Sequence, residues 1–179
     1  MGVAVTLATG ALAAVMMGDD GRIFAPATQH PPSPESVAAA RRAAHERAMR
    51  PSDNLTWPLH GKVTGRFGES RGGRPHEGLD IPMPADTPIK AAASGRVVMR
   101  EWQDGYGKYT CIAHRTLTTC YGHQSRFGTK LGAKVMRGEV IGYVGHTGNS
   151  GAIHLHFEVR RGTKPWGKAM NPARFLPRG

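Results

Sequence analysis

Two short clusters of histidine and carboxylate residues in this 179-residue chain have the composition of a metal site. The first cluster reads His76-Glu-Gly-Leu-Asp80, in which an imidazole and a carboxylate stand four residues apart. The second cluster contains His154 and His156, which are separated by one residue. Imidazole and carboxylate are both ordinary zinc ligands, and three protein ligands with an open fourth position are typical of a catalytic site. The two clusters together therefore predict a zinc ion that can activate a water molecule.

The second cluster lies in an alternating segment, residues 151–160, that is typical of a β-strand. Apolar residues occupy every second position, so they face one side of the strand and the polar residues face the other. We expect the apolar side to pack in the core. The polar side would then carry both histidines and Glu158, which either orients a metal ligand by a hydrogen bond or faces solvent. Taken alone, the pattern also fits two half-exposed strand histidines without chemistry. The apolar set is Ile153, Leu155, Phe157 and Val159.

A third histidine follows a β-like run, in Tyr121-Gly-His123. The order HxxxD, then YxH, then HLHFE resembles the lysostaphin/LytM-type zinc metallopeptidases of the M23 family. Flanking phrases are similar too, and the resemblance extends from about Trp57 to Leu176. These phrases are Arg66-Phe-Gly68, Thr87–Ala91, Ser94–Val98 and Gly138–Gly145.

The resemblance implies a role for each of these side chains. His76, Asp80 and His156 would bind the zinc ion, and His123 and His154 would form the catalytic pair. A neutral imidazole is suited to accept a proton from water near neutral pH, although the sequence does not decide which of the two is the base. The implied activity is hydrolysis of peptide bonds in peptidoglycan stems or cross-bridges. The alternative is a non-catalytic module on the same scaffold that binds the wall or activates an amidase.

A glycine-rich loop, residues 145–151, leads into the alternating segment. His146 and Asn149 belong to this loop, and we expect both to line the substrate groove together with Tyr121. The loop departs from the family pattern, because Ser150-Gly-Ala-Ile153 stands where members commonly have Ser-Thr-Gly-Pro. This departure removes no predicted ligand.

The high glycine content, 24 of 179 residues, favours many short strands over helices in the second half of the chain. The resemblance implies a mainly β fold, an antiparallel two-sheet β-sandwich of the LytM/lipoyl-like kind. A lipoyl-carrier function is disfavoured because no lysine stands at a suitable hairpin tip. The strands that we expect before the histidine-rich one are residues 62–68, 89–92, 95–101, 108–114, 118–123 and 140–144.

The N-terminal third divides into two parts that precede the predicted peptidase domain at 56–179. Residues 1–27 form an apolar leader, which we expect to be a signal peptide or a short anchor. Residues 28–55 contain a proline-rich linker and one helix rich in alanine and arginine, with Ser33 as the N-cap and Pro34 at the first helical position.

The two cysteines, Cys111 and Cys120, flank a predicted hairpin turn and would lie opposite each other. Two reduced thiols in the core are the alternative, but we favour a disulfide, which requires an oxidising compartment. This interpretation supports a secreted or cell-envelope protein, or a virion-associated one if a phage encodes it.

The formal net charge is +11 for the whole chain, and residues 1–53 contribute nothing to it, with five arginines and five acidic residues. The predicted peptidase domain therefore carries the entire excess. Such a charge favours contact with anionic wall polymers. No motif combines aromatic and basic residues in a way that indicates nucleic-acid binding, so we expect none. We expect a monomer whose partner is a peptidoglycan peptide.

Overall fold

The computed structural model describes residues 16–17, 23–24 and 31–178, and the chain divides into two compact units, Met1–Ala40 and Arg41–Gly179. The predicted leader at 1–27 therefore lies outside the described residues, except for two short strands. These strands, β1 (Met16–Met17) and β2 (Ile23–Phe24), pair antiparallel. Helix α1 follows at Pro34–Ala48. No helix in the described part of the chain is both long enough and apolar enough to cross a membrane.

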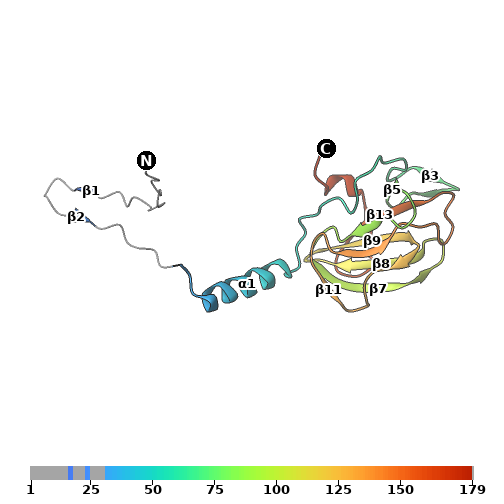
Figure 1. The fold of residues 1–179 in the computed structure, drawn as a ribbon. Helices are drawn as coiled ribbons and strands as arrows, with labels where there is room; N and C mark the ends of the chain where they lie inside the picture. The colour runs from blue at the N-terminus through green and yellow to red at the C-terminus, as the bar shows by residue number, and fades with distance from the viewer. Residues whose placement is uncertain (1–15, 18–22, 25–30, 179) are drawn as a thin grey trace, which may run out of the picture. The chain divides into compact units, whose positions relative to one another are not determined.

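Helix α1 begins as the sequence predicts (Figure 1). The Ser33 hydroxyl accepts a hydrogen bond from the Ser36 backbone N–H at 3.1 Å, which satisfies one of the free amides of the first turn. Pro34 is the first helical residue, where its missing N–H costs nothing. None of the fifteen residues of the helix is buried, so tertiary packing contributes little to its stability.

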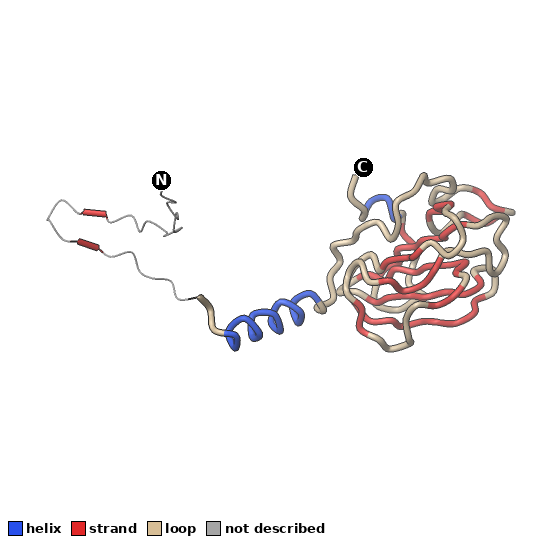
Figure 2. Tube along the Cα trace, viewed as in Figure 1, coloured by secondary structure: helices blue, strands red, loops and turns tan. Residues whose placement is uncertain are grey.

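One antiparallel sheet of seven strands forms the larger layer of the second unit (Figures 1 and 2). Its strand order is β11-β7-β8-β9-β13-β14, and β5 pairs with the first half of β13. Strands β7, β8, β9 and β13 are seven to nine residues long and carry most of the pairing. The strands are β5 (Leu79–Pro82), β7 (Gly95–Gln103), β8 (Gly107–Ala113), β9 (Leu117–Gln124), β11 (Lys134–Val135), β13 (His154–Arg161) and β14 (Ala169–Met170).

A smaller antiparallel sheet of three strands, in the order β10-β12-β6, shares one core with the larger sheet. Ile89 and Ile141 from the small sheet and Leu155 and Phe157 from the large sheet are all fully buried in this core. The mainly β, antiparallel fold with an N-terminal helix is thus confirmed. The remaining elements are β3 (Ser70–Arg71), β4 (Arg74–Pro75), β6 (Pro88–Lys90), β10 (Arg126–Phe127), β12 (Val140–Tyr143) and the 3-10 helix η1 (Pro172–Arg174).

The predicted disulfide between Cys111 and Cys120 is confirmed. The two residues are direct cross-strand partners on β8 and β9, and their Cα atoms are 4.1 Å apart, as in a non-hydrogen-bonded antiparallel pair. The bridge therefore ties together the hairpin whose second strand carries His123.

Two expectations about strands were wrong. Residues 62–68 form no regular strand, and only Gly65 makes an isolated bridge, with Asp80. The histidine-rich strand begins at His154 rather than at residue 151, so Ile153 lies before it and is 43% exposed. The small and polar residues of 145–151 favour turns, which delays the start of the strand.

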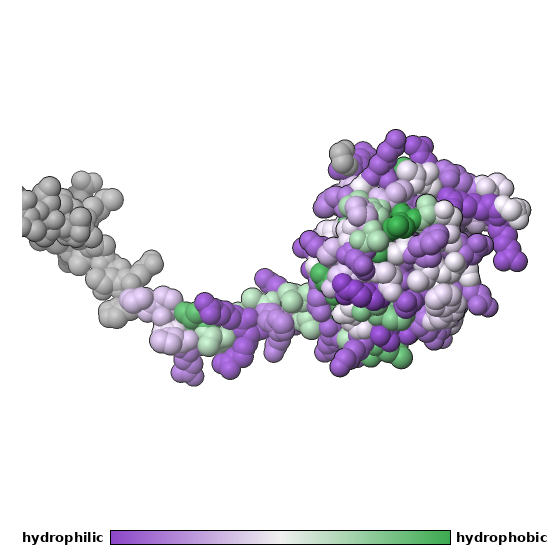
Figure 3. Space-filling view, turned by 45° about the vertical axis from the view of Figure 1, so that its right-hand side comes forward, coloured by the Kyte–Doolittle hydropathy of each residue, from purple (hydrophilic) through white to green (hydrophobic). Residues whose placement is uncertain are grey.

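Hydrophilic side chains cover most of the face of the second unit seen in Figure 3, and the apolar residues on it lie in separate small patches. This distribution agrees with the concentration of positive charge in residues 54–178.

Candidate metal centre

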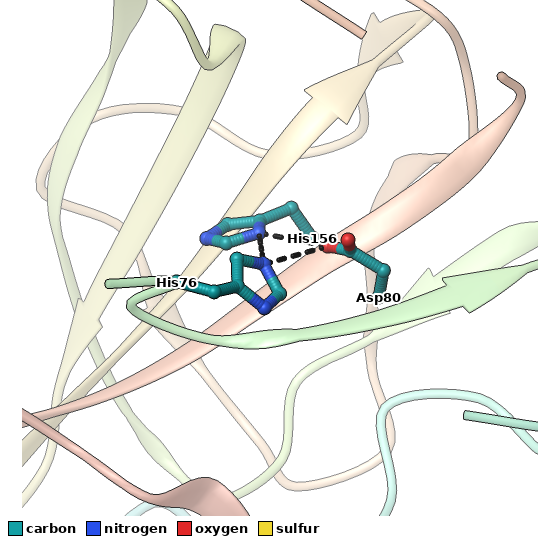
Figure 4. A group of neighbouring side chains, drawn as sticks. All are labelled: His76, Asp80 and His156. Atoms are coloured by element: carbon teal, nitrogen blue, oxygen red, sulfur yellow. Dashed lines mark hydrogen bonds and ion pairs between the residues drawn. The ribbon is translucent and has the colours of Figure 1, made fainter. Parts of the chain in front are cut away.

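Three side chains, two from neighbouring strands and one from the loop between β4 and β5, converge on one point (Figure 4). Asp80 on β5 and His156 on β13 are direct cross-strand partners, and His76 lies just after β4. The Asp80 Oδ1 atom is 3.1 Å from His76 Nε2 and 2.9 Å from His156 Nδ1, and these two nitrogens are 3.0 Å apart. All three residues are buried, so the antiparallel register brings together the ligands that the resemblance implies.

In His76 and His156, the ring nitrogen that points away from Asp80 makes a hydrogen bond that identifies which ring atom carries the hydrogen. His76 Nδ1 donates to the Arg66 carbonyl at 2.9 Å, and His156 Nε2 donates to Glu158 Oε1 at 3.0 Å. Each ring therefore presents an unprotonated nitrogen to Asp80. When both rings are neutral, three acceptors therefore face each other, and such a set binds a cation.

This donor set fits a zinc ion. Tetrahedral ligands at about 2.1 Å from a metal are about 3.4 Å apart, which is slightly more than the 2.9–3.1 Å measured here. Burial would raise the pKa of Asp80, but its contacts with His154, His156 and His76 lower it far below its ordinary value. Burial would lower the pKa of His156, but its hydrogen bonds to Asp80 and Glu158 raise it to about 9. Both shifts show that the centre favours positive charge.

The fully buried Glu158 belongs to a network that extends from His156 towards the protein surface. Its Oε2 atom accepts hydrogen bonds of 2.6 Å from the Tyr109 hydroxyl and from Arg160 Nε. Burial alone would raise the pKa of Glu158, but His156 and Arg160 lower it to about 2. A second guanidinium nitrogen of Arg160 donates to Glu77 at 2.7 Å. The network therefore links Glu77, which follows His76 in the chain, with Glu158, which accepts the hydrogen bond from His156.

His123 and His154 lie beside the three converging side chains, with ring centroids 4.7 Å apart. Each donates its Nδ1 hydrogen to a backbone carbonyl at 2.8 Å, His123 to Thr147 and His154 to Ala152. Each Nε2 atom is therefore the unprotonated one, and that of His154 is 3.4 Å from Asp80 Oδ1. Burial lowers the pKa of His123 to about 4, so this ring is neutral at neutral pH.

An open groove of about 500 Å³ exposes the centre to solvent. Of the three residues that the sequence assigns to a groove, only Asn149 lines it. His146 is exposed but does not line the groove, and Tyr121 is fully buried in the core, where its hydroxyl accepts from the Ala92 N–H at 2.8 Å. The groove is lined by the centre, His123 and His154, together with Arg71, Arg74, Pro75, Glu77, Asp104, Gly105, Tyr106, Asn149 and Gly151.

Residues two positions apart on a strand normally face the same side, but Tyr121 and His123 do not. A bulge in β9 explains this difference. The pairing register between β8 and β9 shifts between Lys108 and Thr110, and His123 has a positive φ of 59°. A positive φ turns the side chain away from the side that strand alternation would give it. The glycine at position 122, on the β-bulge, was the one sequence signal for this irregularity.

The sequence reasoning assigned no contact in the site to five residues. Arg71 donates to Asp80 Oδ2 at 2.7 Å, and the Thr147 carbonyl holds His123. Arg160 joins Glu158 to Glu77, whose carboxylate also accepts from the Tyr106 hydroxyl at 3.2 Å. These contacts cross up to 83 positions of the sequence, so no local pattern indicates them.

Two curated proteins illustrate what the chain is similar to. It is 33% identical over 130 residues to the murein hydrolase activator EnvC of Escherichia coli K12. The aligned region covers 72% of this chain and 30% of EnvC. It is 41% identical over 93 residues to the DD-carboxypeptidase/endopeptidase Mpg of Neisseria meningitidis serogroup B, which covers 51% of this chain and 21% of Mpg. The chain thus spans less than a third of either relative.

Solved structures agree with this similarity. The catalytic domain of the antimicrobial peptidase lysostaphin from Staphylococcus simulans superposes with a TM-score of 0.57 at 32% identity, over 64% of this chain and 89% of that one. The sequence profile described as Peptidase family M23 matches residues 74–172, which is more than half of the chain and includes all five converging residues. The protein therefore belongs to peptidase family M23.

Proposed function

We propose that this protein is a zinc-dependent endopeptidase that hydrolyses peptide bonds in peptidoglycan stems or cross-bridges. One observation carries the proposal. His76 Nε2, Asp80 Oδ1 and His156 Nδ1 converge within 2.9–3.1 Å of one another, in an open groove that His123 and His154 also line. A site of this composition combines a place for a cation with two imidazole rings that can accept a proton.

His76, Asp80 and His156 would hold the zinc ion. A zinc ion bound in such a site polarises a carbonyl group and lowers the pKa of bound water to about 7. Glu158 and the Arg66 carbonyl keep the two imidazoles in the tautomer that binds metal.

His123 and His154 are the residues of this chain that would move protons. The Thr147 and Ala152 carbonyls fix the Nδ1 hydrogens, which leaves both Nε2 atoms able to accept a proton from an attacking water. The protonated imidazole would then return the proton to the leaving amine. The lowered pKa of His123 keeps its ring neutral before the reaction, as a base must be.

Peptidoglycan as the substrate is supported by the similar proteins and by the charge. EnvC is named as acting with murein hydrolases and Mpg as an endopeptidase. The net charge of +11 favours anionic wall polymers. The disulfide is consistent with a secreted or cell-envelope location, where such a bond persists.

A second candidate function is a non-catalytic activator of murein hydrolases, because EnvC carries that name and matches more of this chain than Mpg does. The two candidates differ in what the centre must do. An activator requires neither bound zinc nor the proton acceptors of His123 and His154, whereas the endopeptidase requires both.

Digestion of purified sacculi tests the proposal. The full chain is incubated with sacculi that contain glycine bridges and with sacculi that contain direct cross-links, and the zinc content of the protein is measured alongside. About one zinc per chain and release of peptide fragments is the expected result, and the fragment masses identify the bond. Zinc-free protein that releases nothing, but increases release by an added amidase, would establish the activator instead.

A further inference from the structure

Two charged side chains that line the groove are not neutralised by any neighbour within residues 31–178. Arg74 lies on β4, and Asp104 lies in the turn between β7 and β8. Both are exposed. Neither side chain makes an ion pair or a hydrogen bond with another residue in the described part of the chain.

The other charged residues of the groove already have partners. Arg71 donates to Asp80 Oδ2 at 2.7 Å, and Glu77 accepts from Arg160 at 2.7 Å and from Tyr106 at 3.2 Å. These contacts hold the residues of the centre in place. A ligand could bind Arg71 or Glu77 only by breaking them. One cation and one anion, contributed by two different loops, therefore remain for an incoming molecule.

We infer that Arg74 and Asp104 determine specificity, and that the groove takes a peptide with a free carboxylate for Arg74 and a free ammonium group for Asp104. The inference rests on the proposed function for its substrate, because the groove adjoins the proposed metal centre. Guanidinium binds carboxylate through two parallel hydrogen bonds, whereas a peptide made only of glycine offers neither charged group along its length. The groove is thus matched to cross-links whose residues carry charged side groups.

Exposed charge pairs of this kind change affinity by up to about fivefold each, and salt weakens them. Binding is therefore measured at low ionic strength. The protein is the full chain in a His154→Ala background, so that cleavage does not consume the peptides. Four labelled peptides of equal length are compared, in which one side group is glutamate or glutamine, and another is lysine or norleucine.

The expected result is a preference of about two- to fivefold for glutamate over glutamine and for lysine over norleucine. Arg74→Glu removes the first preference and Asp104→Asn removes the second. Arg137→Glu is the matched control, because Arg137 is exposed, lies outside the groove and undergoes the same change of charge.

Equal binding of the glutamate and glutamine peptides would overturn the inference, as would absence of binding by all four. It is also overturned if Arg137→Glu removes the preference as fully as Arg74→Glu, since net charge would then be responsible. If the peptides bind selectively but the chain without the His154→Ala change cleaves no sacculi, this inference stands. The proposed endopeptidase is then refuted. The two proposals therefore fail in different ways.

Discussion

Glu158 Oε1 accepts a hydrogen bond from His156 Nε2 at 3.0 Å, in the fully buried interior of the large sheet. The two residues are two positions apart on β13 and lie on the same side of that strand. The carboxylate fixes the imidazole with Nδ1 turned towards Asp80, so the orientation of a proposed metal ligand depends on a residue that touches no metal.

Glu158→Gln is therefore expected to weaken zinc binding by about 10- to 100-fold, because it removes the charge that holds the His156 ring and leaves Arg160 without its buried partner. Competition with a chelator of known affinity measures this change. Glu139→Gln serves as the control, since Glu139 is exposed and its carboxylate accepts a hydrogen bond from the Met136 backbone N–H, away from the centre. Unchanged zinc affinity in Glu158→Gln would show that the contact does not orient the ligand.

Gly78 lies against the His156 ring, and a methyl group there would meet the ring and the Phe157 carbonyl. Gly78→Ala should shift β5 away from β13 and reduce both zinc affinity and the free energy of unfolding, the latter by about 1–3 kcal/mol. Gly151→Ala is the matched control, because open space surrounds that position. Denaturant unfolding measures the free energy of unfolding of both variants. An equal loss in Gly78→Ala and Gly151→Ala would argue against this packing.

The disulfide should stabilise the β8–β9 hairpin. Its cysteines are nine positions apart, for which the loop-entropy estimate is about 2.6 kcal/mol. The variant with serine at both positions 111 and 120 is expected to lose about 2–3 kcal/mol in urea unfolding. Wild-type protein measured in reducing agent should unfold at the same urea concentration as this variant, and a variant as stable as the oxidised wild type contradicts the prediction.

His114 makes stability depend on pH at a place away from the metal centre. Its Nδ1–H donates to the Ser94 carbonyl at 3.0 Å, and its Nε2 accepts from the Thr119 hydroxyl at 2.8 Å, so both ring nitrogens are satisfied in the neutral form. Burial lowers the pKa of His114 below 6.5. The unfolded chain thus binds more protons than the folded chain as the pH falls through 6.5, and stability declines.

The expected decline is at most about 1.4 kcal/mol per pH unit, and this contribution is fully present only above pH 6.5. Urea unfolding of wild type and His114→Gln from pH 7.5 to pH 5 measures the difference between the two slopes. The variant is expected to be less stable at pH 7.5 but to lose less on acidification. Parallel pH profiles would mean that His114 does not titrate in this range.

The sequence predicted those parts of the site that depend on strand alternation and residue chemistry. His154, His156 and Glu158 share one side of β13, as their spacing indicates, and the cross-strand pairing of β5 and β13 then brings Asp80 to His156. Tyr121 was misassigned because a local bulge and the positive φ of His123 break the alternation on β9.

The network around Arg160 was not predictable for a different reason. Arg160 meets Glu77 only because the fold brings together two segments that are 83 residues apart. Nothing in the local sequence distinguishes Arg160 from the other arginines of the chain. Asp104 likewise becomes a groove residue only through the three-dimensional placement of the turn between β7 and β8.

We propose that the five converging residues divide into three that bind zinc and two that transfer protons. Zinc content and peptide release from sacculi, measured together for wild type, His156→Ala and His154→Ala, test this division most directly. We predict that His156→Ala loses both zinc and activity. In contrast, His154→Ala should retain about one zinc per chain and lose about 100- to 10,000-fold in rate. Undiminished cleavage by His154→Ala, or zinc retained at wild-type affinity by His156→Ala, would contradict the account.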